Sequence, residues 1–428
     1  MQYAIPEGTS GTDRILIDEN MIHEEVVRLR RHFHAHPELS WEEKETQKAI
    51  TEYLTGLGLV CRPIGGTGVI TEIRGSRCAL CGESLPRDTE KGAVSCENEQ
   101  NPFPSRPGEK ILGIRADIDA LPVQEETGFP FASQNKGVSH ACGHDTHIAM
   151  ALTAARILCE NKDVLPCPVR FVFQPAEETP GDSGGDRICD DPFLLACTRM
   201  IAIHTWSKIP AGQAGICEGP VMASTDTFEV RIQGKGGHGA VPQEAIDPVP
   251  AAAEFIQAVQ RIVSRETDPF TSNVVTIGSV HAGTTWNVIP DSAEIMGTTR
   301  SYDPAVTASF PERLQRIADG VALTTGTKIT VNYHKGPDPV INDREAVRTA
   351  VRAAAPIFGE ENIIEWRQMV GEDFACYRAP KCLMFLGGGL AEEELRYPQH
   401  SPHYIIDEKV LTKGVEYFLR YVFEYGEE

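Results

Sequence analysis

The stretch S-H-A-C-G-H-D-T-H-I-A-M, residues 139–150, places a thiol, an imidazole and a carboxylate within four positions, at Cys142, His144 and Asp145. Thiolates and imidazoles are the ligands that Zn²⁺ and related ions prefer, so Cys142 and His144 look like half of a metal site. A complete site normally needs three or four protein ligands. An inert buried thiol beside a capped histidine is the alternative explanation, and the rest of the chain has to decide.

The sequence turns helical directly after this stretch. Apolar residues recur on one stripe with a period of about 3.6 residues, at Ile148, Ala149, Leu152 and Ala155. The pattern predicts a helix over residues 146–160, with Asp145 either as its N-cap or as a group that supports a ligand. Such a helix would fix where Cys142 and His144 point.

Bulk composition restricts the class of protein. At 428 residues the chain exceeds what one hydrophobic core usually supports, so two domains are expected. The 41% hydrophobic and 24% charged residues are typical of a folded soluble protein. A net charge of -21 argues against nucleic acid as a partner. The sequence has neither a signal-like leader nor a membrane-length apolar run, so we expect a cytoplasmic protein with no membrane partner.

The twelve cysteines are expected to be free thiols or metal ligands rather than a disulfide framework. Cys78 and Cys81 form a C-x-x-C with Cys96 downstream, but a zinc knuckle would need a fourth ligand close by. The alternating histidines His32, His34 and His36 are another candidate group of ligands, or else they fill a surface corner before Pro37.

The N-terminal part reads as two helices and a strand followed by an insertion. Helical spacing runs from about residue 21 to residue 59 with a break at Pro37, and the second helix is expected over residues 41–57. Residues 65–73 read as a short strand. Residues 74–110 lose all periodicity, so we expect an inserted mobile loop there.

At four places in the chain, a short apolar segment is followed directly by glycines or polar residues. They are residues 111–116 before D-I-D, residues 169–173 before Q-P-A-E-E, residues 200–203 before His204, and residues 382–386 before G-G-G and, after a loop, His400. Each reads as a buried strand of a doubly wound, mostly parallel α/β sheet. In such sheets, sites form in the crevice outside the carboxyl ends of the strands.

The polar residues expected at this edge can be collected into one candidate site. They are Cys142, His144, Glu177, Glu178, His204 and His400, with Asp117 and Asp119 nearby. Five of them could hold two divalent ions about 3.5–4 Å apart, which leaves one carboxylate over. Because successive side chains diverge, one of the adjacent glutamates can bind metal while the other faces a bridging water.

The expected order of strands and helices changes over residues 228–334. Strands are expected at residues 228–232, 273–280, 293–299 and 328–333, and helices at residues 248–264 and 311–323. The order β-α-β-β-α-β is that of a ferredoxin-like unit. We therefore expect a catalytic domain in two parts, residues 1–222 and 336–428, with a second domain at residues 223–335 inserted between them.

Eight motifs appear along the chain in a fixed order. They are R-A-D-I-D-A-L-P (115–122), H-A-C-G-H-D (140–145), Q-P-A-E-E (174–178), A-I-H (202–204), G-K-G-G-H-G-A-V-P (234–242), N-V-I-P-D (287–291), G-E-D-F (371–374) and H-S-P (400–402). Together they resemble the co-catalytic metallopeptidase family of aminoacylases and carboxypeptidase-G-type enzymes. Within it, the chain is similar to the amidohydrolase branch of hippurate hydrolases, N-acyl-amino-acid deacylases and auxin-conjugate hydrolases, from about residue 31 to residue 411.

The resemblance implies roles for the candidate residues. The implied metal ligands are Cys142, His144, Glu178, His204 and His400. Glu177 matches the general acid/base, and Asp117 matches a carboxylate that orients a ligand. His400 rather than His403 matches the family ligand, because it precedes Ser-Pro.

The inserted unit resembles the family's lid and dimerisation domain. His238 matches a histidine that reaches the partner subunit's site and steadies the developing oxyanion. Asn287 and Arg300 match lid positions that contact substrate, and Arg300 could pair with a substrate carboxylate or simply be solvated. The expected assembly is a homodimer or a higher homo-oligomer.

The implied activity is hydrolysis of a C–N amide bond in a small N-acyl amino acid or aryl-amide conjugate. The implied cofactor is a pair of divalent ions, with manganese favoured over zinc. The alternatives are a hydrolytic deaminase of an aromatic amine such as a nitro-substituted aminobenzoate, a thiol amidase with Cys142 as nucleophile, and a non-catalytic binding protein. Residues 179–192 and 74–110 depart from the family pattern and leave the substrate open.

Overall fold

The computed structural model describes residues 18–75, 103, 105–179 and 181–428. The C-x-x-C with Cys96 and most of the expected loop at residues 74–110 lie outside these residues. Two compact units divide the chain. The larger unit comprises Met1–Gly219, Ile341–Trp366 and Cys376–Glu428, and the smaller unit comprises Pro220–Val340 and Arg367–Ala375.

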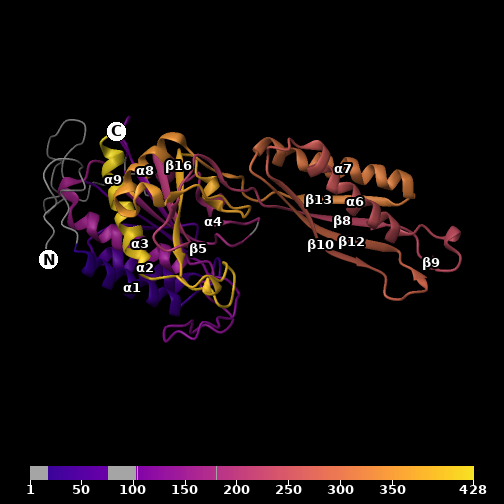
Figure 1. Ribbon diagram of the computed structural model, residues 1–428, viewed down its shortest axis with the longest axis horizontal. Helices are drawn as coiled ribbons and strands as arrows, with labels where there is room; N and C mark the ends of the chain where they lie inside the picture. Colours follow the sequence, from indigo (N-terminus) through magenta and orange to yellow (C-terminus); the bar gives the residue numbers. More distant parts are fainter. Residues whose placement is uncertain (1–17, 76–102, 104, 180) are drawn as a thin grey trace. The chain divides into compact units, whose positions relative to one another are not determined.

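An eight-stranded sheet forms the centre of the larger unit (Figure 1), with the order β1-β2-β4-β3-β5-β16-β6-β15. The strands are β1 (Cys61–Ile64), β2 (Gly68–Ile73), β3 (Leu112–Asp117), β4 (Val169–Gln174), β5 (Arg199–Pro210), β6 (Ala214–Gly215), β15 (Ile363–Ile364) and β16 (Lys381–Gly389). The central strands β4, β3, β5 and β16 are parallel. β1 pairs antiparallel with β2, β2 with β4 and β6 with β16, whereas β15 pairs parallel with β6. The expected α/β class is confirmed, with a mixed rather than a mostly parallel sheet.

Five long helices share one apolar core with the sheet of the larger unit. They are α1 (Glu19–Ala35), α2 (Lys44–Gly56), α3 (His144–Glu160), α8 (Arg344–Phe358) and α9 (Val410–Gly426). Residues Leu112 and Ile114 of β3 and Phe171 of β4 belong to this core. Because side chains alternate along a strand, Arg115 and Arg170 lie on the opposite face, where they are also buried.

The helix expected at residues 146–160 is present, but Asp145 is not its N-cap. α3 begins at His144, Gly143 takes the N-cap position, and no side chain caps it by a hydrogen bond. Asp145 lies in the first turn, where its Oδ2 is 2.9 Å from Nε of Arg30 and 2.8 Å from Nδ1 of His34. The cap expectation was wrong because these two partners on α1 hold the carboxylate.

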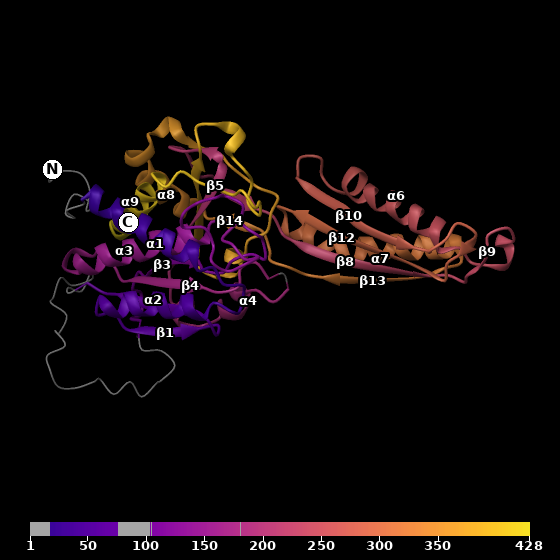
Figure 2. The ribbon, with the colours of Figure 1, turned by 90° about the horizontal axis from the view of Figure 1, so that it is seen from below.

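The smaller unit contains a four-stranded antiparallel sheet with the order β10-β12-β8-β13 (Figure 2). Its elements are β8 (Asp226–Gln233), α6 (Pro248–Glu266), β10 (Asn273–Ala282), β12 (Ser292–Ser301), α7 (Pro304–Thr325) and β13 (Lys328–His334). They follow the expected β-α-β-β-α-β order. Phe228, Val230 and Ile232 alternate as expected and pack in one core with apolar residues of α6 and α7.

The segment at residues 367–375 joins the smaller unit although it is distant in sequence. The backbone N–H of Gln368 donates to the carbonyl of Val221, and that of Ala223 donates to the carbonyl of Val370. These hydrogen bonds join the segment to the first residues of the smaller unit. Among the described residues, no helix is long and apolar enough to cross a membrane.

Candidate metal centre

The carboxyl ends of three adjacent parallel strands bring candidate residues to one edge of the sheet. Asp117 is the last residue of β3, and Glu177 and Glu178 follow β4. His204 was expected just past a strand but lies inside β5, because β5 continues beside β16 to Pro210. The pairing of β5 with β3 ends at Ala202, so His204 lies past the part of β5 that is paired with β3.

The loop before α3 turns through Gly143, which has a φ of 91°. A Cβ atom at this position would lie 2.5 Å from Oγ1 of Thr205, so only glycine fits there. The turn places Sγ of Cys142 3.6 Å from Nε2 of His204. His400 arrives from the loop after β16, and its backbone N–H donates to the carbonyl of Ala141.

The structure brings all five expected ligands and Glu177 into overlapping groups. In each group the potential ligand atoms lie within 4.8 Å of one another, and the groups are Cys142–His144–His204, Cys142–Glu178–His400 and His144–Glu177–Glu178. His144 and Cys142 each belong to two of these groups. The candidate residues therefore form one continuous cluster, in which Nε2 of His400 lies 3.3 Å from Oε1 of Glu178.

Asp119 contacts two of the expected ligands. Nδ1 of His144 lies 2.9 Å from the carbonyl oxygen of Asp119 and 3.3 Å from its Oδ1. The other carboxylate oxygen of Asp119 accepts a hydrogen bond from the backbone N–H of Glu178. Asp119 thus orients the imidazole and leaves its Nε2 facing the cluster, as supporting groups do in metal sites.

Sequence reasoning overlooked His147, whose H-x-x-H spacing with His144 was a usable signal. Its Nε2 accepts a hydrogen bond from the backbone N–H of Thr205, so its Nδ1 carries the proton and donates to Oδ1 of Asp117 at 2.5 Å. Oδ2 of Asp117 accepts from Arg115 and lies 3.4 Å from Nε2 of His144. Both nitrogens of His147 are therefore engaged in holding the surroundings of the cluster.

A second overlooked residue, Glu43, supports the turn that carries the two glutamates. Ala176 has a φ of 52°, which is a strained conformation for a residue other than glycine. The fully buried carboxylate of Glu43 accepts hydrogen bonds from the backbone N–H of Ala176 at 2.8 Å and from Oγ1 of Thr67 at 2.6 Å. These bonds hold the left-handed turn directly before Glu177.

The cluster has a strongly negative electrostatic character. Burial and the charges of Glu178 and Glu177 raise the pKa of the Cys142 thiol well above its ordinary value. Burial lowers the pKa of His144, but the carboxylates of Asp117, Asp119 and Glu178 outweigh it and raise that pKa to about 10. A site that attracts a proton so strongly also attracts a divalent cation, which would replace the proton on the imidazole and the thiol.

Two buried polar atoms of the cluster indicate that its residues fit a metal ion. Nε2 of His144 and Oε1 of Glu178 have no hydrogen-bond partner within the described part of the chain. In His204, Nδ1 donates to the carbonyl of Thr205, which leaves the lone pair of Nε2 facing Cys142. Sulfur, imidazole nitrogen and carboxylate oxygen together suit zinc and other first-row transition ions.

The acidic segment after the two glutamates uses much of its charge within the fold. It carries the short helices α4 (Gly184–Ile188) and α5 (Pro192–Leu195). Carboxylates of the segment form ion pairs with arginines, in the pairs Asp182–Arg187, Asp190–Arg378 and Asp191–Arg62. The acidity that distinguishes this segment in sequence is therefore largely balanced by arginines.

Three expected site residues lie in the smaller unit. His238 is exposed on β9 (Gly237–His238), which pairs with β11 (Val288–Ile289), and Asn287 is exposed just before β11. Arg300 is half-buried on β12, where its Nη1 donates to the carbonyl of Thr299. These three residues are not among the potential ligand groups of the larger unit.

Comparisons with known proteins give the family. The model for peptidase family M20/M25/M40 matches residues 113–424. An N-acetyl-L-cysteine deacetylase of Bacillus subtilis (strain 168) is 36% identical, covering 97% of this chain and 92% of that protein. An N-acyl-L-amino acid amidohydrolase of Geobacillus stearothermophilus is 37% identical, covering 76% and 80%. The crystal structure of the Bacillus subtilis YXEP protein, a dinuclear metal binding peptidase from the M20 family, has a TM-score of 0.75 at 33% identity, covering 94% and 98%.

The fold, the ligand cluster and these matches define a metal-dependent amidohydrolase. The chain belongs to peptidase family M20/M25/M40. The resemblance noted in the sequence is confirmed.

Proposed function

We propose that this protein hydrolyses the amide bond of small N-acyl amino acids with two divalent ions, manganese or zinc, held by the cluster. The observation that carries the proposal is the convergence of Cys142, His144, Glu178, His204 and His400, which lie far apart in sequence. The acyl-amino-acid substrates of the two curated relatives support the substrate class. The dinuclear relative supports the number of ions.

In the proposed reaction Glu177 moves the proton. When bound, the ions supply a water of lowered pKa and polarise the scissile carbonyl. Glu177, which shares a group with His144 and Glu178, takes the proton of the attacking water and returns it to the leaving amine. Asp117 and Asp119 hold the neighbouring imidazoles in place through the contacts described above.

The smaller unit is proposed to act as the lid and dimerisation domain of residues 223–335, as the family resemblance implies. His238 would steady the developing oxyanion in the partner subunit's site, and Asn287 and Arg300 would contact the substrate. The exposure of His238 and of apolar residues such as Trp286 supports this assignment. Light scattering of the full chain should then give a dimer or a larger homo-oligomer, and a monomer would contradict it.

A hydrolysis screen with metal-reconstituted protein tests the proposed reaction. The panel contains hippurate-like amides, acetylated amino acids including N-acetylcysteine, indole-acyl conjugates and nitro-substituted aminobenzoates. We expect turnover of the amides, its loss on chelation and its recovery when manganese or zinc is added back. Turnover of aminobenzoates without amides would indicate a deaminase, and amide hydrolysis that survives complete metal removal would indicate a thiol route through Cys142.

A further inference from the structure

The three alternating histidines of α1 separate into two sets in the structure. His34 is buried and bonds to Asp145 and Glu125. His32 lies in the last turn of α1 and His36 is its C-cap, and both are exposed. Their ring centroids are 4.9 Å apart with an interplanar angle of 40°. The pair takes no part in the metal centre described above.

The hydrogen bond made by Nδ1 of His36 leaves its Nε2 available to bind a metal ion. Its Nδ1 lies 2.7 Å from the carbonyl oxygen of His32, and because a carbonyl only accepts, Nδ1 carries the proton. The lone pair of a neutral His36 is therefore on Nε2. Metal-binding histidines show the same arrangement, with one nitrogen donating to a carbonyl and the other on the metal.

The spacing of the two histidines is one that metal sites use. His32 lies in the last turn of α1, and His36 is the C-cap residue four positions further on. The two histidines of the H-E-x-x-H motif, which binds zinc, have the same spacing.

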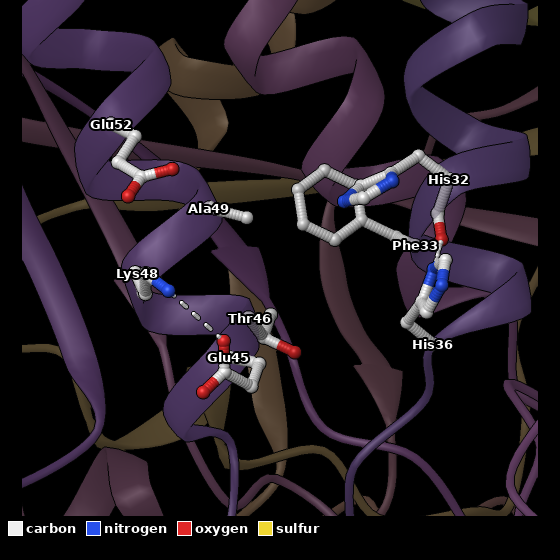
Figure 3. Close-up of a pocket in the computed structure, with 8 residues that line it drawn as sticks. All are labelled: His32, Phe33, His36, Glu45, Thr46, Lys48, Ala49 and Glu52. Carbon is white, nitrogen blue, oxygen red and sulfur yellow. Dashed lines mark hydrogen bonds and ion pairs between the residues drawn. The ribbon is translucent and has the colours of Figure 1, made fainter.

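A cavity of about 300 Å³ opens beside the two histidines, between α1 and α2. Figure 3 shows the imidazoles on the α1 side and the side chains of Glu45, Lys48 and Glu52 on the α2 side. Lys48 lies 3.5 Å from Glu45 and balances one of the two carboxylates. The cavity thus offers room for coordinated water and a net negative charge opposite the imidazoles.

We propose that His32 and His36 form a second, peripheral site for a divalent cation that prefers imidazole, such as Zn²⁺ or Cu²⁺. The two Nε2 atoms are the protein ligands, water fills the remaining positions, and Glu45 and Glu52 contribute negative charge across the cavity. The site does not depend on the catalytic roles proposed above, and its failure would leave them untouched.

Zinc stoichiometry tests the peripheral site. The reconstituted full-length protein is dialysed to equilibrium against micromolar Zn²⁺, and bound zinc per chain is measured by elemental analysis. We expect His32→Gln and His36→Gln each to bind about one zinc ion per chain fewer than the unmodified protein. Loss of a group that only supports a ligand weakens metal affinity by roughly 10–100-fold, and loss of either histidine should weaken zinc affinity at this site by more than that. His281→Gln, which removes an exposed histidine of β10, serves as the matched control and should bind as much zinc as the unmodified chain.

Amide hydrolysis by the same preparations is expected to be unchanged, which shows that the zinc lost was not at the catalytic cluster. His36 also closes the end of α1, so His32→Gln is the decisive variant if His36→Gln folds poorly, as judged by circular dichroism. The proposal fails if His32→Gln binds as much zinc as the unmodified chain, or if His281→Gln loses zinc to the same extent. Either result would mean that the pair is an ordinary solvated pair of histidines.

Discussion

Replacing Glu177 by glutamine is expected to lower kcat for amide hydrolysis by a factor of about 10²–10⁴ while leaving the metal content unchanged. A glutamine amide cannot take a proton from water or return one to the leaving amine. The side chains are nearly equal in size, so the turn held by Glu43 and Ala176 should persist. Steady-state kinetics and elemental analysis of the same preparation measure the two quantities.

The neighbouring residue provides the matched control. Glu178 shares ligand groups with Cys142, His400 and His144, so Glu178→Gln should lose metal as well as activity. If Glu177→Gln loses metal instead, the two glutamates have exchanged roles. Retention of full activity by Glu177→Gln would exclude it as the group that moves the proton.

Replacing Arg30 by methionine is expected to lower the free energy of unfolding by about 3–5 kcal/mol, because the change breaks a buried ion pair. Nε of Arg30 lies 2.9 Å from Oδ2 of Asp145, with side chains only 2% and 1% exposed. Nη1 of Arg30 also lies 3.1 Å from Oε1 of Glu408. Without Arg30, the carboxylate of Asp145 in the first turn of α3 loses its arginine partner and keeps its contact with His34.

Arg31→Met is the matched control for this change. Arg31 pairs with the same Glu408 at 2.6 Å but is 47% exposed, so its removal should cost no more than about 1 kcal/mol. Both arginines also lie over the ring of Phe131, so the two changes remove a similar aromatic contact. Urea unfolding of the metal-loaded proteins measures both costs, and equal losses would contradict a special role for the buried pair.

Local sequence determined much of the fold, because periodicity and helix signals act within one element. The alternation of Phe228, Val230 and Ile232 fixes which side of β8 faces the helices of the smaller unit. The apolar stripe after His144 predicted α3 to within two residues. The candidate site residues could be collected in advance because the carboxyl ends of parallel strands meet at one edge, and the family resemblance implied which of them bind metal.

Tertiary structure alone decided which partner each polar side chain takes. Asp145 reads as a helix cap in sequence, yet Arg30 and His34 of α1 hold it, and α1 lies more than a hundred residues away. His204 lies within a strand rather than after one because β16 extends the pairing of β5. Distant segments create these contacts when they pack together, and no local pattern of residues encodes them.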